Sequence, residues 1–422
     1  MKLPFRDPLP PVPPAVKFVL AVMVANAVGF GIIIPVTPAL VMELSGQGVS
    51  EATAIGGWLA FVYAIAQFLF SPLMGNLSDR FGRRPVLLAS VAGFAIDFLV
   101  LAVAPSLVWL FAIRFFAGVF GASNAPAQSV IADVTPPEHR ARMYGLIGAA
   151  FGAGFAFGPA IGGLLGVLGH RVPFFVAAGL LAIAFTYGWA KLPETLPVEN
   201  RRAFDWRRAN PIGAFYEARK LKGLGAIALV YFLWQVATLV YPMTWSYFTI
   251  ARYGWSEGLV GLSLAGVGIA MVAMQTLVLP VAVARWGERG TALRGISGAS
   301  VAMLGFAAAT QSWMVFALFP LMATQSLVHA NLTAMMTRRA DATTQGEVQG
   351  FASAVMAVGS LVAPLLYNPL QSWFTGPGAP APIPGIAYLV AGLIAASCLP
   401  IVMAMPRAES QGSTNVNSDA NR

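Results

Sequence analysis

The sequence predicts an all-α membrane protein with twelve transmembrane helices. Three observations support this prediction: hydrophobic residues make up 57% of the 422 positions, charged residues make up only 10%, and long apolar runs recur along the whole chain. An apolar run of about 20 residues covers the roughly 30 Å hydrocarbon core of a bilayer as a helix. The twelve expected spans are residues 16–41, 54–77, 85–104, 106–131, 141–166, 172–191, 223–250, 257–284, 290–309, 312–336, 346–373 and 385–405.

The basic residues predict how these spans are oriented. If both termini are cytoplasmic, the cytoplasmic segments hold 23 of the 26 Lys and Arg residues, the outer loops hold Arg171 and Arg252, and Arg114 lies within a helix. Cytoplasmic loops carry such an excess of positive charge. The net charge of +9 is therefore a topology signal, and its scatter over seven cytoplasmic segments argues against a nucleic-acid partner.

A hydrophilic stretch at residues 192–222 separates six expected spans from six. It holds seven Lys or Arg residues against four acids, and it is either a solvated linker or a segment that contacts anionic lipid. We therefore expect two pseudo-symmetric six-helix halves. The predicted organisation is a cytoplasmic tail at 1–15, a first half at 16–191, the linker at 192–222, a second half at 223–405 and a cytoplasmic tail at 406–422.

The sequence contains none of the usual signs of an enzyme. It has no cluster of metal-ligating residues, no nucleophile–base pair and no phosphate-binding loop, so we expect neither a cofactor nor a bound metal. The single cysteine, Cys398, lies in the last span and cannot form a disulfide within the chain.

Residues 75–84 form the most informative short segment. They read Gly-Asn-Leu-Ser-Asp-Arg-Phe-Gly-Arg-Arg between the second and third spans, and four charges cannot lie in lipid. This order resembles the signature loop of the major facilitator superfamily of transporters. Asp133, at the cytoplasmic end of the fourth span, is expected to pair with Arg83 or Arg84. The residues of this expected conformational latch are Gly75, Asp79, Arg80, Gly82, Arg83, Arg84, Asp133 and Arg142.

Asp97 and Arg114 are the two charged residues expected deep in the membrane. Asp97 precedes the turn near Pro105 by eight residues and Arg114 follows it by nine, which places both at a similar depth. An isolated buried charge costs at least about 2.5 kcal/mol, so we expect the two to pair. The pair is either purely structural or part of proton coupling, and the Arg114-x-x-x-Gly118 order resembles a pattern of proton-coupled members of the superfamily.

The fifth span carries a ladder of small residues. Glycines spaced by four place bare backbone on one helix face, which favours close helix packing. The same residues also resemble the motif of exporters, or antiporters, within the superfamily. They are Gly154, Gly158, Pro159, Gly162 and Gly163.

Several polar and aromatic residues within the spans are candidates for a substrate site. Tyr63 and Gln67 share a helix face and either form interhelical hydrogen bonds or line a cavity. The aromatic residues of the seventh span fit core packing equally well. His329 is either a buried neutral histidine or a proton relay and ligand contact, because imidazole titrates near physiological pH. The candidates are Asn26, Tyr63, Gln67, Asn124, Gln128, Gln235, Thr238, Trp245, Gln325 and His329.

Residues 280–289 occupy the position in the second half that corresponds to the signature loop. Gly287 matches Gly82, and Arg285 and Arg289 stand roughly where two of the loop arginines stand, but the aspartate is missing. A degenerate copy in the matching place is expected of two structurally similar halves, which hold their substrate near the midplane between them.

A narrower resemblance rests on four segments: residues 79–85 (Asp-Arg-Phe-Gly-Arg-Arg-Pro), 132–135 (Ala-Asp-Val-Thr), 140–142 (Arg-Ala-Arg) and 345–350 (Gln-Gly-Glu-Val-Gln-Gly). With them, almost the whole chain is similar to the tetracycline-proton antiporter family. That family has aspartates in the first and ninth helices where this chain has Asn26 and Gly298, while its third-helix acid is kept as Asp97. The substitutions bear on both the substrate and the proton stoichiometry.

These observations predict a monomeric, multi-pass protein of the bacterial inner membrane. We expect it to export a small drug-like or tetracycline-like compound in exchange for protons, by alternating access of a central site to the two sides. Proton coupling is expected to involve Asp97, Arg114 and His329. The alternatives are a metabolite or sugar transporter without strict proton coupling, and a receptor or assembly partner that keeps the fold but does not transport.

Overall fold

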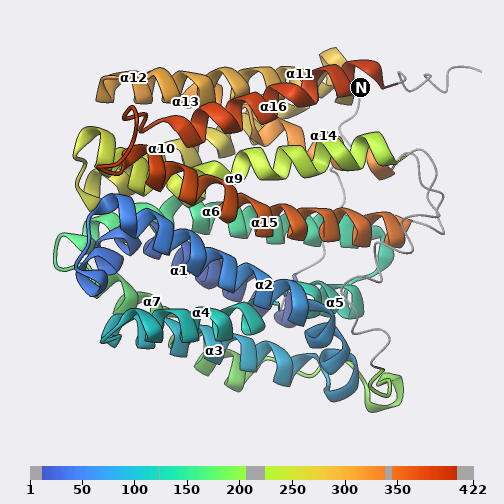
Figure 1. The fold of residues 1–422 in the computed structure, drawn as a ribbon. Helices are drawn as coiled ribbons and strands as arrows, with labels where there is room; N and C mark the ends of the chain where they lie inside the picture. The colour runs from blue at the N-terminus through green and yellow to red at the C-terminus, as the bar shows by residue number, and fades with distance from the viewer. Residues whose placement is uncertain (1–11, 123, 206–223, 338–344, 406–422) are drawn as a thin grey trace, which may run out of the picture.

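The computed structural model describes residues 12–122, 124–205, 224–337 and 345–405, and these ranges contain helices and no β-strand (Figure 1). The helices before the linker are α1 (Pro14–Ser45), α2 (Val49–Phe81), α3 (Arg83–Val103), α4 (Leu107–Gly121), α5 (Asn124–Val134), α6 (Pro137–Gly166) and α7 (Val172–Lys191). The linker contains the 3-10 helix η1 (Val198–Asn200).

The helices after the linker begin with α9 (Gly225–Tyr253). They continue with α10 (Glu257–Ala273), the π-helix η2 (Met274–Val278), α11 (Leu279–Ala308), α12 (Ser312–Ala317), α13 (Phe319–Ala323), α14 (Ser326–Thr337), α15 (Gln345–Thr375) and α16 (Ile386–Ala404).

Two glycines with positive φ break the chain at the matching places predicted from the sequence. Gly82 has φ 104° and ends α2, and Gly287 has φ 68° within the helical stretch of α11. L-residues with a side chain rarely adopt this backbone region. The chain can therefore turn sharply at both points, which the sequence pattern had marked as equivalent.

Ten helices of the described ranges are long and apolar enough to cross a membrane. Two expected spans, 257–284 and 290–309, fall in one of these ten, the continuous stretch Glu257–Ala308. The expected fifth span is represented by a shorter apolar helix, Gly152–Gly166. The protein is thus a multi-pass helical membrane protein, and the number of twelve spans stays a prediction.

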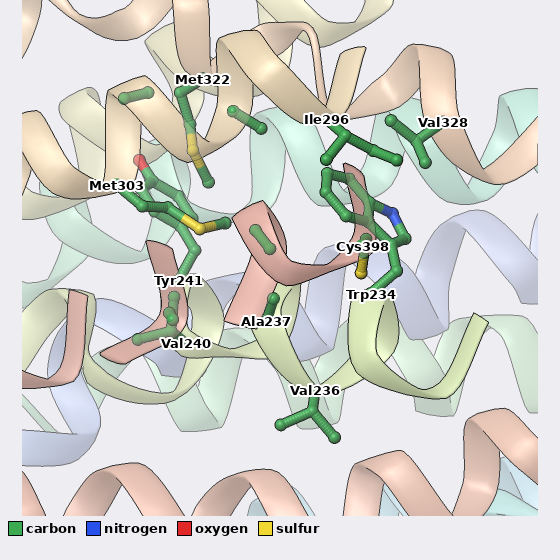
Figure 2. Packing of buried hydrophobic residues seen from close by; sticks show 14 of the residues in the cluster. Trp234, Val236, Ala237, Val240, Tyr241, Ile296, Met303, Met322, Val328 and Cys398 are labelled. Carbon is green, nitrogen blue, oxygen red and sulfur yellow. The ribbon is translucent and has the colours of Figure 1, made fainter. Parts of the chain in front are cut away.

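Buried hydrophobic residues form two large clusters. One is built from residues 224–405, and the other from residues 15–192 together with Tyr247. Figure 2 shows part of the first cluster, in which Trp234 and Tyr241 project from one side of α9 and Val236 from the opposite side. Large apolar side chains also cover the outer surface, as expected of helices that face lipid; they include Leu99, Phe116, Ile183, Trp313 and Leu393.

The helices before and after the linker meet mainly through two helix pairs, α6 with α10 and α2 with α15 (Figure 1), with smaller contacts of α9 with α2 and α1. Polar contacts between the two groups include the hydroxyl of Ser50, which donates to the Ser372 carbonyl at 2.6 Å, and the amide of Asn368, which donates to the Thr53 carbonyl at 3.1 Å. All these residues lie toward the end of the bundle where α1 leads into α2. We call this the α1–α2 end, and the end that contains Gly82 the Gly82 end.

The glycine ladder of α6 allows the closest helix packing. A Cβ atom at Gly158 would lie 2.9 Å from the Cα of Gly31, and one at Gly162 would lie 2.1 Å from the carbonyl oxygen of Ile32, both on α1. Gly163 instead faces α10, where its Cβ would lie 3.0 Å from the Cα of Gly261. The predicted role of the ladder in close helix packing is confirmed. The ladder packs against two helices, α1 and α10.

We expect Gly162→Ala to destabilise the protein. The new methyl group would collide with the backbone of α1 and force α1 and α6 apart. Overpacking of this kind typically costs about 1–3 kcal/mol. Thermal unfolding of the purified protein in detergent should show a lower midpoint temperature than for the unmodified chain.

Gly152→Ala on the same helix is the matched control, because a Cβ atom there would meet nothing within 4 Å beyond the nearby backbone of its own helix. Alanine is favoured over glycine in a helix by about 1 kcal/mol, so the midpoint temperature should stay the same or rise. Equal midpoints for the two variants would contradict the close approach at Gly162.

Candidate functional site

A buried ion pair lies between α3 and α4. The carboxylate of Asp97, 1% exposed, accepts a hydrogen bond from the guanidinium of Arg114, so the predicted pairing is present. The second carboxylate oxygen of Asp97 and the Nε of Arg114 are buried without a hydrogen-bond partner. Tyr63 of α2 lies within electrostatic range of both charges. The pair thus neutralises itself but leaves polar atoms that another group, or a proton, could satisfy.

Gln67 lies on α2, as Tyr63 does, and its side chain forms a hydrogen bond to α4. Its side-chain amide donates to the carbonyl oxygen of Gly121 at 3.0 Å and to the Tyr63 hydroxyl at 3.4 Å. Close packing makes this possible, because a Cβ atom at Gly118 would lie 2.3 Å from the Tyr63 carbonyl oxygen. Of the two alternatives for Gln67, the interhelical hydrogen bond is the one that the structure contains.

A cavity of about 250 Å³ opens among α9, α10 and α14. Gln235, Thr238, Gln325 and His329, four of the predicted substrate-site residues, line it. The complete lining is Trp234, Gln235, Thr238, Tyr241, Pro242, Leu264, Val267, Gly268, Met271, Gln325, Ser326 and His329.

His329 belongs to a small polar network at this cavity. Its Nε2 lies 3.0 Å from the hydroxyl of Tyr231, which in turn lies 3.1 Å from the hydroxyl of Thr333. Tyr231 was missed at the sequence level, although it lies on the same face of α9 as Gln235 and Thr238. The imidazole of His329, a residue of α14, is therefore also fixed by a contact with Tyr231 of α9.

Trp245, another predicted substrate-site residue, does not line this cavity. Its side chain is 0% exposed, and its indole N–H donates to the Ser263 hydroxyl at 2.8 Å. The rings of Tyr241 and Phe306 pack against it with centroid distances of 4.5 and 5.2 Å. Core packing, the alternative drawn from the sequence, describes this residue.

A charged network occupies the Gly82 end, and Arg83 is its centre. The guanidinium of Arg83 donates to Asp79 at 2.5 Å, to Asp133 at 3.2 Å and to the Ser78 hydroxyl at 3.1 Å. The sequence left open whether Arg83 or Arg84 meets Asp133. Arg84 points elsewhere, because its guanidinium donates to the carbonyl oxygen of Trp189 at 2.7 Å.

Glu194, the first acid after α7, completes this network and was missed by the sequence analysis. One carboxylate oxygen accepts from the backbone N–H of Arg83 at 2.8 Å and the other from that of Arg84 at 3.3 Å. An acid is favourable at these unpaired N–H groups at the start of α3. Gly82 leaves room for it, since a Cβ atom there would lie 2.2 Å from the Glu194 carboxylate. The available signal was an acid three residues after an apolar helix, in a loop where basic residues outnumber acids.

Four predicted residues, Gly75, Arg80, Gln128 and Asn26, lie outside the ion pair, the cavity lining and the Arg83 contacts. Arg80 is exposed and lies over the Phe81 ring at 5.1 Å, and a Cβ atom at Gly75 would meet open space. Gln128 is exposed on α5, and the side-chain oxygen of Asn26 is buried without a hydrogen-bond partner. The side chains of Asn124 and Arg142 lie outside the described residues.

Comparison with known proteins identifies the family. A family model described as the Major Facilitator Superfamily matches residues 19–364. The chain is 36% identical over 386 residues to the tetracycline resistance protein, class C, of Escherichia coli, which covers 92% of this chain and 96% of that protein. It is also 36% identical to the class G protein of Vibrio anguillarum, over 91% of this chain and 95% of that one.

Solved structures agree with the fold. The human organic anion transporter MFSD10 superposes with a TM-score of 0.69, at 24% identity, over 93% of this chain and all of that chain. The chain therefore belongs to the major facilitator superfamily, as a membrane transporter rather than an enzyme, and within that superfamily to the family of the tetracycline resistance proteins.

Proposed function

We propose that this protein exports a small drug-like compound, with tetracycline-like compounds as the first candidates, in exchange for protons. The observation that carries the proposal is the Asp97–Arg114 pair, a titratable carboxylate buried away from a separate, uncharged cavity. The names of the relatives support resistance to tetracycline as the class of task. The bacterial inner membrane, with both termini in the cytoplasm, is the setting that the loop charges favour.

The working architecture is proposed to be twelve helices in two six-helix halves, residues 16–191 and 223–405, that rock about a central site. The division of the buried residues into two large clusters supports two such units. One chain contains both the ion pair and the cavity, so a monomer is proposed to be the functional unit.

The contacts between these units support an inward-facing arrangement. Ser50 with Ser372, Asn368 with Thr53, and Gly163 against Gly261 all join the two units toward the α1–α2 end. The loop charges assign this end to the outer side of the membrane. When the helices are closed at the outer side, a central site can open only to the cytoplasm. In this state it would take up its compound from the cytoplasm.

Proton exchange is proposed to act on Asp97. Deep burial favours the protonated, uncharged carboxyl group, and a neighbouring arginine favours the ionised one. A movement that separates Arg114 from Asp97 would therefore promote proton uptake, and a movement that restores the pair would promote proton release. His329 is the second candidate, because it lines the cavity and an imidazole titrates near physiological pH.

Two positions bear on the substrate and on the number of protons. A Cβ atom at Gly298 would lie 2.5 Å from the Thr324 hydroxyl, so the ninth-helix acid of the family has no room here. Asn26, in the place of the first-helix acid, cannot titrate and has a buried, unpartnered oxygen. We therefore propose fewer proton-carrying groups than in the family pattern.

The Arg83 network is proposed to be the conformational latch of the Gly82 end. Its contacts join the α2–α3 turn to α5 through Asp133 and to the linker through Glu194. In alternating access, the helices part at the outer side while they come together at the Gly82 end. Charge-assisted pairs at the Gly82 end could form in one arrangement and break in the other.

Cells that express the protein should become less susceptible to its substrates. We expect the minimum inhibitory concentration of at least one compound in a panel that includes tetracycline to rise by about fourfold or more. Energy-dependent efflux of that compound from loaded cells is the accompanying measurement. A panel without any shift, from cells with the protein in the membrane, would count against export.

Asp97→Asn should abolish transport driven by a pH gradient, because asparagine cannot carry a proton. Binding, or downhill exchange, of the same compound should remain. The measurement is substrate accumulation in inside-out vesicles with an imposed pH difference. Glu199→Gln, at an exposed carboxylate on η1, is the matched control and should transport normally. A folded Asp97→Asn protein that still accumulates substrate uphill would move the proton role to His329.

Arg83→Lys should lower the transport rate by about tenfold or more at an unchanged amount of protein in the membrane. Lysine keeps the charge but lacks the planar fork that meets Asp79 and Asp133 together. Arg84→Lys is the control, because a lysine can still donate to the Trp189 carbonyl oxygen. Similar rates for both variants would remove the latch role from Arg83.

A further inference from the structure

The turn at Gly287 carries an exposed aromatic ring with two arginines beside it. Trp286, the residue before this glycine, is 41% exposed. The guanidinium carbon of Arg294 lies 4.1 Å from the centroid of its ring, and that of Arg285 lies 5.9 Å from the same centroid. A guanidinium is attracted to the face of an indole, so the ring holds the two positive charges close together.

The corresponding turn of the first half contains an acid for its buried arginine. Arg83 pairs there with Asp79, four residues earlier in the chain. When Gly287 is matched with Gly82, Ala284 stands in the place of Asp79. The second copy of the turn therefore lacks the acid that serves the first.

No acid in the described part of the chain forms an ion pair with Arg285 or Arg294. Arg294 donates from one guanidinium nitrogen to the carbonyl oxygen of Gly290 at 3.1 Å. A guanidinium carries five N–H groups, and both side chains are exposed. The two arginines can therefore donate hydrogen bonds to an anion from outside the chain.

An exposed apolar surface leads along the helix to Arg285. Leu277, in η2, and Val281, in the first turn of α11, are 71% and 64% exposed. The three residues are spaced by four, which places them along one side of the helix. At 1.5 Å per residue, this surface is about 12 Å long. It presents hydrocarbon along its length and a positive charge at its end.

This surface is expected at the cytoplasmic edge of the membrane. The expected eighth span ends at residue 284, and the loop charges assign the turn after it to the cytoplasmic side. Tryptophan is enriched at the membrane–water interface, and arginine side chains reach from there toward water. The cytoplasmic leaflet is also the one that carries anionic phospholipids, which attract basic residues near the membrane surface.

We propose that Arg285, Trp286 and Arg294 form a binding site for an anionic phospholipid of the cytoplasmic leaflet. The lipid phosphate accepts hydrogen bonds from the two guanidinium groups, whose forked donors match a phosphate. One acyl chain lies against Leu277 and Val281, and Trp286 positions the two arginines. The lipid thus supplies the counter-charge that this turn lacks. The site does not depend on which compound the protein transports.

The test measures lipid binding to the full-length protein in a neutral detergent by native mass spectrometry. Two phospholipids with identical acyl chains are titrated: phosphatidylglycerol, which is anionic, and phosphatidylcholine, which is zwitterionic. One basic residue near a membrane surface favours an anionic lipid about fivefold, so two arginines should make phosphatidylglycerol bind about twenty-five-fold more tightly. Glycerol phosphate at an equal concentration should not displace it, because a headgroup without chains makes no contact with the apolar surface.

The double variant Arg285→Gln and Arg294→Gln should lower this preference to about twofold or less, and Arg285→Gln alone should lower it about fivefold. The matched control is the double variant Lys17→Gln and Lys191→Gln. It removes the same charge from two exposed lysines that are also expected on the cytoplasmic side, and it should keep the full preference. An unchanged midpoint of thermal unfolding shows that each variant is folded.

Equal binding of the two lipids by the unmodified protein would overturn the site. A preference that the folded arginine variants keep, or an equal loss of preference in the lysine control, would do the same. Displacement of phosphatidylglycerol by an equal concentration of glycerol phosphate would assign the arginines to a soluble phosphate and overturn the lipid. The expected binding in a protein that exports no compound would still support the site, because the site does not rest on export.

Discussion

A hydrocarbon environment offers no hydrogen-bond partners, and the polar groups of this protein are arranged by that constraint. Asp97 is met by Arg114 from the neighbouring helix, and Gln67 reaches across to the carbonyl oxygen of Gly121. Hydroxyl groups such as that of Thr238 return their proton to their own helix. A polar side chain left alone among apolar atoms would cost several kcal/mol. Asp97 and Gln67 therefore lie where a second helix meets them.

Small residues decide which helices can approach closely. Helix association in a membrane has little hydrophobic driving force, so backbones must come near enough for van der Waals contact. The glycines of α6 achieve this on two sides, with Gly158 against α1 and Gly163 against α10. On the other side of the bundle, a Cβ atom at Gly57 of α2 would lie 2.4 Å from the Cβ of Asn368 on α15. The contacts of Gly163 with α10 and of Gly57 with α15 join the helices before the linker to those after it at one end of the bundle.

The ion pair and the cavity lie on different helices, and packed side chains connect them. Helix α2 packs against α4, which carries Arg114, and against α15. Helix α15 in turn contacts the cavity wall, since a Cβ atom at Gly359 would lie 2.8 Å from the side chain of Gln235. A shift of α2 relative to α15 would therefore reach both places. Discrete arrangements of packed helices are the usual means by which a local change becomes a large one.

The sequence by itself indicated the membrane-spanning class, a charged turn within residues 75–84 and the partnership of Asp97 with Arg114, because charges inside apolar runs are rare and their positions along a helix translate into depth. The structure confines the turn to Gly82, since α2 continues as a helix to Phe81. Only the tertiary structure decided which polar residues meet a cavity. Helical spacing tells which residues share a face but not what that face meets, so Trp245 was expected at the site and lies in the core, while Ser326 was overlooked and lines the cavity. Ser326 begins α14, and its hydroxyl donates to the carbonyl oxygen of Ala323 at the end of α13, so its place depends on how the chain turns between these two helices.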